Sequence, residues 1–520
     1  MVTVSNRSPV RVGQARSVGL DGLTGIPVTV DCDISRGLPG MNIVGLGDTA
    51  VVQARDRVRS AVINSGLQWP KSRVVVSLSP ASVPKTGSGF DLPMVLAILA
   101  AQGMVHPADI TDAAVIGELG LDGTVRGVSG VLPMALAARE SGVARLAVPA
   151  DNLVEASRVP GIRVTGLDHL TQLVRWATGE ESGGTVPVPS ENTGAAVPDL
   201  SEVTGQPVAR RALETAAAGG HHLWLSGPPG SGKSMLAERL PGILPPLDDT
   251  EQLEAAAVHS IAAEKGDLDG IWRRTRPFVA PHPSLTLPAL TGGGSGRIRP
   301  GAVSLAHHGV LFLDEAPEVS RPVLEGLRVP MERGTVSVER VRRTLVLPAR
   351  FQLVIASNPC PCGAEEPAEC VCRGGVRDRY LQRISGPLRD RIDITATTGG
   401  NRSATVSGDS AESSAVVRDR VCEARARAVS RWSGRREDPP WRTTADVPGP
   451  VLRRDFPAGD AAMLVLEDQL RRGVLSQRGV DRSLRVAWTL TDLAGGRRPG
   501  VGDVMDAVEM FTGTVEGVGQ

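Results

Sequence analysis

Residues 227–234 read Gly227-Pro228-Pro229-Gly230-Ser231-Gly232-Lys233-Ser234 and follow the apolar run Leu223-Trp224-Leu225 after one serine. A strand, a glycine-rich loop and a lysine that opens a helix are together typical of a phosphate-binding loop. Glycines permit backbone angles closed to other residues, so successive N–H groups can converge on phosphates at the positive end of the helix dipole. We therefore predict an α/β core that binds ATP, with Lys233 at the β- and γ-phosphates and Ser234 at Mg2+.

The alternative is an ordinary glycine-rich turn, and the rarity of lysine argues against it. Only Lys71, Lys85, Lys233 and Lys265 are lysines among the 57 basic residues, so a basic position in this chain is by default arginine. Phosphate binding explains why position 233 is an exception.

Composition limits the class of protein. A chain of 520 residues accommodates about three to four domains. Its 57 basic and 57 acidic residues balance, so any nucleic acid must be held by local patches. The apolar stretch near Leu92 to Val105 is interrupted by polar residues and breakers and is too short to span a bilayer, and residues 1–20 lack an apolar signal segment. We expect a cytoplasmic protein without membrane contact.

Two breaker-rich stretches divide the chain. Residues 179–198 carry few large apolar groups and predict a linker. Before them, β-rich runs alternate with helical patterns, which predicts an α/β domain over residues 1–178. The nucleotide-binding core spans 199–400, and the helical patterns that follow predict a helical C-terminal lid over 401–520.

Two further apolar runs end in residues that suit hydrolysis. Residues 309–315, Gly-Val-Leu-Phe-Leu-Asp-Glu, have the pattern of a buried parallel strand that presents carboxylates at its C-terminal edge. Asp314 would hold Mg2+, and Glu315 would orient or deprotonate the attacking water. Residues 351–358 end in Asn358, which could position water near the γ-phosphate as sensor 1 does in AAA+ ATPases. The alternatives are a solvated acid pair and an asparagine that caps the loop before Pro359.

Arginines follow the core at two places. Arg391, with Arg389 as its rival, could be donated to the γ-phosphate of a neighbouring copy, as in ring ATPases. Arg478, with Arg482 as its rival, could reach back to nucleotide as sensor 2. A solvated salt-bridge cluster is the alternative in both cases.

Three motifs carry a family resemblance. They are Ile-Ser-Arg-Gly-Leu-Pro-Gly at 34–40, Leu-Ala-His-His-Gly at 305–309 and Asn-Pro-Cys-Pro-Cys-Gly at 358–363. From about Val18 to Val508 the chain resembles the magnesium-chelatase-like AAA+ ATPases of the YifB/ComM family. The resemblance implies a Lon-protease-like N-terminal α/β domain, an AAA+ P-loop core and a helical lid. It also implies a homo-hexameric ATPase motor that drives DNA branch migration in recombination or natural transformation.

A Lon-like domain raises the question of protease activity. The loop at 84–89, Pro-Lys-Thr-Gly-Ser-Gly, resembles Lon's nucleophile loop, but the serine position falls on Gly89 and the lysine position near Leu132 has no lysine. Serine–lysine chemistry needs both groups together, so we expect a domain that does not cleave peptides, although Ser88 is one residue away.

Two segments match those that face the central pore in similar ring ATPases. Residues 291–299 form a glycine-rich stretch, and Val336 to Arg350 alternate apolar and basic residues as a hairpin would. Arginines there would contact DNA phosphates without reading bases, and a solvated hairpin face is the alternative. The DNA-binding candidates are Arg297, Arg299, Arg340, Arg342 and Arg343.

Four of the six cysteines lie within residues 360–372, and in a reducing compartment such a cluster suggests a metal. Cys360, Cys362, Cys370 and Cys372 could hold structural Zn2+ in a loop that lacks a core of its own. Redox-active or unliganded thiols are the alternatives.

Two other functions compete with a DNA motor. One is a chelatase-type ATPase that remodels a partner protein, and the other is a noncatalytic nucleotide switch. Intact Lys233, Asp314, Glu315 and Asn358 argue against the switch.

Overall fold

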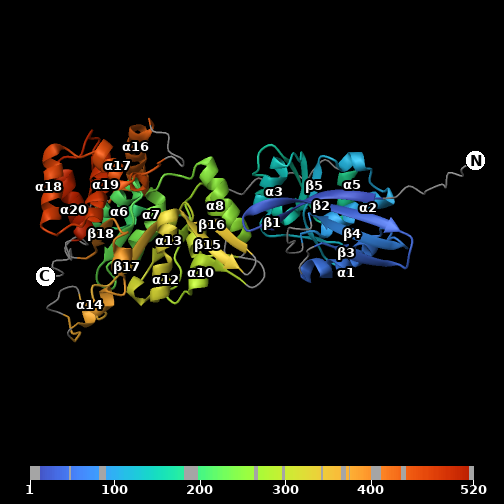
Figure 1. Cartoon of the computed structure of the whole chain (residues 1–520), viewed down its shortest axis with the longest axis horizontal. Helices are drawn as coiled ribbons and strands as arrows, with labels where there is room; N and C mark the ends of the chain where they lie inside the picture. The colour runs from blue at the N-terminus through green and yellow to red at the C-terminus, as the bar shows by residue number, and fades with distance from the viewer. Residues whose placement is uncertain are drawn as a thin grey trace, which may run out of the picture. The chain divides into compact units, whose positions relative to one another are not determined.

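The structure is a computed structural model that describes residues 12–45, 49–80, 89–180, 197–262, 268–294, 299–340, 343–364, 370–373, 375–399, 411–434 and 441–513. The chain forms two compact units (Figure 1). One comprises residues 1–193 with 256–268 and 294–299, and the other comprises 194–255, 269–293 and 300–520. Among the described residues, no helix has the length and apolarity that a membrane span requires.

The N-terminal unit is built on a seven-stranded mixed sheet of order β3-β4-β2-β1-β5-β8-β9. Strands β1 and β2 pair antiparallel from Val12↔Asp33 to Asp21↔Thr24, and β4 pairs antiparallel with β2. The remaining neighbours pair in parallel. Its elements are β1 (Val12–Asp21), β2 (Thr24–Ser35), β3 (Gly40–Val44), α1 (Thr49–Asn64), β4 (Arg73–Ser79), α2 (Asp91–Gln102), β5 (Ala113–Val115), β6 (Glu118–Leu119), β7 (Val125–Arg126), α3 (Val131–Glu140), β8 (Arg145–Pro149), α4 (Leu153–Ala156), β9 (Arg163–Leu167) and α5 (Leu170–Ala177).

Helix α2 is the centre of this unit. All its residues from Asp91 to Ala101 are buried, and it packs on β1 and β2. The two backbones approach closely at Gly13, where a Cβ atom would lie 2.1 Å from the carbonyl oxygen of Ala97. Gly13 on β1 therefore lets this buried, mostly apolar helix pack closely on the sheet. Ser88 lies outside the described residues.

The rest of the chain contains a five-stranded parallel sheet of order β11-β14-β17-β10-β18 and a helical C-terminal part. Its elements are α6 (Pro207–Gly219), β10 (Leu223–Ser226), α7 (Lys233–Ile243), α8 (Asp249–Ala262), α9 (Leu268–Trp272), β11 (Phe278–Val279), α10 (Leu287–Thr291), β12 (Gly292–Gly293), β13 (Arg299–Pro300), α11 (Ala302–Leu305), β14 (Val310–Leu313), α12 (Arg321–Gly326), α13 (Arg328–Arg333), β15 (Thr335–Arg340), β16 (Arg343–Pro348), β17 (Gln352–Ser357), α14 (Val376–Leu381), α15 (Gly386–Arg389), β18 (Ile394–Thr397), α16 (Ser414–Trp432), α17 (Gly449–Asp455), α18 (Asp460–Arg471), α19 (Gln477–Leu493) and α20 (Val501–Thr512).

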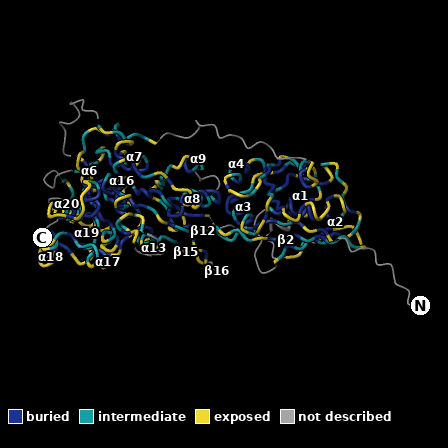
Figure 2. Tube along the Cα trace, turned by 90° about the horizontal axis from the view of Figure 1, so that it is seen from above, coloured by how far each residue is buried: buried dark blue, intermediate teal, exposed yellow. Residues whose placement is uncertain are grey.

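The parallel sheet is covered by helices, as the apolar strands require. Every residue of β14 and β17 is buried, which is typical of strands enclosed on both faces. Helices α6 and α7 pack on the sheet, and α16 packs on both of them. In Figure 2 the buried residues gather in the interior of each unit. The α/β core with a parallel sheet is therefore confirmed.

The C-terminal helices have an apolar centre of their own. Trp432 at the end of α16 lies edge-on to Phe456, with ring centroids 5.2 Å apart. The Trp488 indole N–H of α19 donates to the carbonyl of Phe456 at 2.8 Å. The predicted helical C-terminus is confirmed by these packed helices.

Candidate nucleotide-binding site

The candidate site lies where four parallel strands end. The register pairs Ser226 of β10 with Ser357 of β17 on one side and with Thr397 of β18 on the other. The phosphate loop, Asn358 and Thr398 therefore leave the sheet at the same edge. Strand β14 pairs with β17 and brings Asp314 to this edge too. Ligands of open α/β sheets bind at such an edge.

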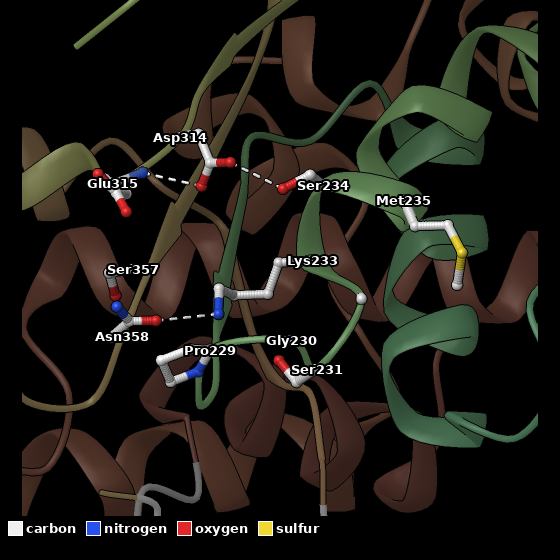
Figure 3. Close-up of a pocket in the computed structure, with 11 residues that line it drawn as sticks. Pro229, Gly230, Ser231, Lys233, Ser234, Met235, Asp314, Glu315, Ser357 and Asn358 are labelled. Carbon is white, nitrogen blue, oxygen red and sulfur yellow. Dashed lines mark hydrogen bonds between the residues drawn. The ribbon is translucent and has the colours of Figure 1, made fainter. Parts of the chain in front are cut away.

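The strand ends enclose a cavity of about 350 Å³ (Figure 3). It unites the predicted residues of three separate sequence motifs. Its lining residues are Pro229, Gly230, Ser231, Gly232, Lys233, Ser234, Met235, Asp314, Glu315, Ser357 and Asn358.

The glycines of the phosphate loop are required for two different reasons. Gly230 and Gly232 have φ values of 76° and 83°, which L side chains rarely adopt. At Gly227, a Cβ atom would lie 2.1 Å from Thr398 Oγ1 and 2.3 Å from the Thr398 carbonyl oxygen. Conformation therefore selects the first two glycines, and close packing against the end of β18 selects the third.

Lys233 is the cation of the cavity. Its Nζ donates to the carbonyl oxygens of Gly227 at 2.7 Å and Pro228 at 2.9 Å, and to Asn358 Oδ1 at 3.1 Å. Burial lowers the pKa of this ammonium. An ammonium has three donors, so these oxygens satisfy it while keeping it beside the predicted sensor amide (Figure 3).

Ser234 and Asp314 form the second polar pair of the cavity. Ser234 Oγ donates to Asp314 Oδ2 at 2.7 Å, and the other carboxylate oxygen accepts the Glu315 N–H at 2.9 Å. Hydroxyl and carboxylate oxygens at a helix N-terminus fit Mg2+ together with phosphate oxygens. The donor set therefore fits the metal and nucleotide expected from the sequence.

Glu315 has an unusual backbone. Its φ and ψ of 47° and 42° are left-handed, which is uncommon for a residue other than glycine. Such strain collects at functional sites. The turn ends β14 abruptly and leaves the Glu315 side chain exposed at the cavity instead of continuing the strand.

Sequence reasoning missed two residues that brace the phosphate loop. Gln206 Nε2 donates to the Ser231 carbonyl at 3.1 Å, and Gln206 Oε1 accepts the Gly399 N–H at 3.1 Å. The hydroxyls of Ser231 and Thr398 lie 2.6 Å apart. The one available signal was the Gly205-Gln206-Pro207 triplet at the start of α6.

The predicted finger and sensor 2 arginines lie at the opposite edge of the sheet. The carbonyl of His222, just before β10, accepts the N–H groups of Asp393 and Ile394 at the start of β18. Arg391 precedes this point and pairs with Glu332. Arg478 is exposed and lies 3.7 Å from Asp390. Neither arginine lines the cavity of its own chain.

The two rival arginines are more enclosed. Arg482 pairs with the buried Asp393 and donates to the Arg391 carbonyl at 3.1 Å. Burial opposes ionisation of Asp393, but Arg482 and a hydrogen bond from His221 hold its pKa well below its usual range. Arg389 lies over the Trp224 ring at 5.4 Å.

The predicted hairpin is confirmed as β15 and β16, which pair antiparallel from Thr335↔Pro348 to Arg340↔Arg343. The DNA-binding candidates Arg340 and Arg343 form the last backbone pair of this hairpin, and Arg299 is exposed at the start of β13. Arg297 and Arg342 lie outside the described residues. Contact of these arginines with DNA stays a prediction.

The cysteines predicted to cluster do meet. The four Sγ atoms lie within 4.8 Å of one another, and all four cysteines are free thiols.

Comparison with known proteins assigns the family. Residues 199–406 match "Magnesium chelatase, subunit ChlI", residues 30–152 match "Subunit ChlI of Mg-chelatase", and residues 411–510 match "Magnesium chelatase, subunit ChlI C-terminal". Protein YifB of Escherichia coli is 40% identical over 91% of both chains. Competence protein ComM of Haemophilus influenzae is 38% identical over 90% of this chain and 91% of its own.

The chain belongs to the YifB/ComM magnesium-chelatase-like family. An uncharacterized protein of Mycobacterium tuberculosis is 49% identical over 96% of this chain and 98% of its own. YifB/ComM membership indicates an AAA+ type ATPase that uses ATP and Mg2+, in agreement with the cavity.

Proposed function

We propose that this chain is an ATP-driven motor that assembles as a ring of six copies and moves branched or single-stranded DNA, in recombination or transformation. The observation that carries the ATPase part is the convergence of Lys233, Asp314, Glu315 and Asn358 on one cavity. The DNA part is supported by the similarity to a competence protein and by the arginines at the hairpin tip.

Five residues of the cavity have roles in phosphoryl transfer. Bound ATP with Mg2+ supplies the phosphoryl group and neutralises charge that develops on it. Lys233, which now donates to a loop carbonyl, would bind phosphate oxygens, and Ser234 with Asp314 would hold the metal. Glu315 would orient or deprotonate the attacking water, and Asn358 would help to position it.

The arginine positions favour action between copies. Arg391 and Arg478 lie at the edge of the sheet opposite their own cavity. We infer that in the ring they face the cavity of the neighbouring copy and stabilise negative charge there. Arg478 is the more exposed, with 70% of its side chain accessible, whereas Arg391 has 11% and must first leave Glu332.

A motor that remodels a partner protein is the second candidate. The balanced charge of the chain favours it, because no overall field draws the molecule to DNA.

The test is steady-state ATP hydrolysis by the purified chain without DNA, with single-stranded DNA and with a four-way junction. The Glu315→Gln variant is the blank. A DNA-stimulated rate that this variant lacks is the expected result. If no DNA changes the rate of ATP hydrolysis but a protein partner raises it, the chain is a protein-remodelling motor instead.

A further inference from the structure

The four clustered cysteines have the geometry of a tetrahedral metal site. Cys360 Sγ lies 3.2 Å from Cys370 Sγ, 3.3 Å from Cys372 Sγ and 3.4 Å from Cys362 Sγ. Cys362 Sγ lies 3.7 Å from Cys370 Sγ. Four thiolates bound to Zn2+ at about 2.3 Å define a tetrahedron with edges of about 3.8 Å. The sulfur atoms are therefore already arranged around one point.

Backbone N–H groups point at these sulfurs, as they do around bound thiolates. The N–H groups of Ala364 and Val371 donate to Cys362 Sγ, and that of Cys362 donates to Cys360 Sγ. Hydrogen bonds of this kind orient metal ligands and stabilise their anionic form. A cluster of unliganded thiols gains little from them, because a neutral sulfur is a weak acceptor.

Three features connect the cysteine loop to the nucleotide cavity. Cys360 follows Asn358 by two residues. Gly363 approaches the phosphate loop so closely that a Cβ atom would lie 2.8 Å from Pro229 Cδ. After the last cysteine, α14 carries the buried Tyr380, which forms a hydrogen bond with the backbone of Asn358. Both ends of the loop are thus tied to the sensor residue.

We propose that Cys360, Cys362, Cys370 and Cys372 bind one Zn2+ ion, and that this structural metal holds Asn358 and Pro229 in position for nucleotide. The described part of the loop offers one buried cysteine, Cys360, as its apolar anchor. Metal ligation replaces the core that so short a segment cannot build. The metal site stands independently of DNA, whereas its effect on ATP rests on the proposed nucleotide function.

The first experiment measures metal content of the full chain. The wild-type protein and Cys422→Ser, a cysteine outside the cluster, should each contain one zinc per chain by plasma mass spectrometry. Cys362→Ser/Cys372→Ser, which changes two cysteines that are not buried, should contain none. Chelated wild-type protein refilled with Co2+ should show the ligand-field and charge-transfer absorption of a tetrahedral tetrathiolate. Protein that binds neither metal, or that holds these cysteines as disulfides, would overturn the site.

The second experiment measures the affinity of a fluorescent ATP analogue. Zinc removal should weaken binding about tenfold, equivalent to ~1.4 kcal/mol. Added Zn2+ should restore affinity in wild type and in Cys422→Ser but not in the double variant. Unchanged affinity after zinc removal would overturn the coupling. Lys233→Ala should lose nucleotide yet keep its zinc, so a failure of the nucleotide function is recognised separately.

Discussion

Lys233 and Glu315 line the same cavity, but we expect their substitution to affect different steps. One should weaken ATP binding, and the other should stop ATP hydrolysis. Lys233→Ala removes charged hydrogen bonds to phosphate worth about 1.5–3 kcal/mol, so ATP affinity should fall by at least about tenfold. Glu315→Gln keeps the size of the side chain and should bind ATP normally while turnover stops. Equilibrium binding and steady-state hydrolysis measure the two effects. Normal hydrolysis by Glu315→Gln would contradict its role.

Gly227 offers a test of packing at the phosphate loop. The new methyl group of Gly227→Ala would overlap the backbone of Thr398, so we expect a loss of stability of about 1–3 kcal/mol and weaker ATP binding. Gly434→Ala is the control, because a Cβ atom there meets nothing within 4 Å. Chemical denaturation should separate the variants, and equal midpoints would refute the overlap.

His307 predicts a dependence of stability on pH. Its Nδ1 accepts the Arg350 N–H at 3.1 Å, so its Nε2 carries the proton that faces Glu254 at 3.3 Å. Burial lowers the pKa of His307 to about 4. The unfolded histidine takes up a proton near pH 6.5, so the stability is fully present above 6.5 and is lost as pH falls towards 4.

The loss across this window should reach ~3 kcal/mol, since one pKa unit corresponds to about 1.4 kcal/mol. His307→Asn keeps an acceptor for Arg350 but does not titrate, so its unfolding free energy should change less between pH 7 and pH 5. Parallel pH profiles of variant and wild type would show that another group is responsible.

The sequence was enough to predict the site residues that have a specific chemical role. It was not enough to predict the residues that hold the phosphate loop in place. Lys233, Asp314 and Asn358 each follow an apolar strand, so their meeting at one edge follows from parallel pairing. Gln206 and Thr398 brace the loop from segments almost 200 residues apart. Thr398 carries no pattern that reveals such a contact, and the Gly205-Gln206-Pro207 triplet is the one signal for Gln206.

At the scale of elements, helix α19 carries two arginines one turn apart, Arg478 and Arg482, for which we predict different roles. Arg482→Ala would leave Asp393 buried without its cation, so stability should fall by about 3–5 kcal/mol. Arg478→Ala changes an exposed side chain and should leave stability unchanged while ATP hydrolysis falls. Denaturation and hydrolysis measured on both variants decide between the roles. A stable Arg482→Ala protein without ATPase activity would make Arg482 the sensor.

The hairpin of β15 and β16 should be tested through its salt dependence. If Arg340 and Arg343 each neutralise one phosphate, their double alanine variant should reduce the slope of log affinity against log salt by about 1.8 on duplex DNA. Arg471→Ala/Arg472→Ala at the C-terminal end of α18 is the matched control, since both side chains are exposed. An unchanged slope would place the DNA contact elsewhere.

Elements were predictable where apolar spacing is regular. Strands β14 and β17 and the hairpin follow their apolar patterns, and α19 begins at Gln477. Its first turns present polar residues, and the signal for its start is Ser476, whose hydroxyl accepts the Gly479 N–H at 3.1 Å. Strand β11 has two residues and leaves no pattern to detect.

At the scale of the whole molecule, action between copies predicts complementation. Lys233→Ala and Arg478→Ala proteins should each be inactive, but mixed rings would contain contacts with an intact lysine on one copy and an intact arginine on its neighbour. Random mixing should restore about a quarter of the competent contacts. Hydrolysis that is no greater than the sum of the separate proteins would show that Arg478 does not act across the ring.

Ring assembly and DNA movement were expected from family resemblance and not from residues. An arginine that serves a neighbouring copy looks, within one chain, like any charged residue at a strand start. The domain ranges stay proposals for the same reason, because breaker-rich stretches indicate where a chain can divide but not how its parts cooperate.

The oxygens around Lys233 bear on how the protein discards its spent nucleotide. When phosphate leaves, the partly buried ammonium of Lys233 would lose its acceptors. Without other acceptors, this loss would cost considerable free energy. The carbonyls of Gly227 and Pro228 and the Asn358 amide can take the lysine back at once. These acceptors lower the energetic cost of releasing the product. Fast product release is therefore favoured over tight product binding.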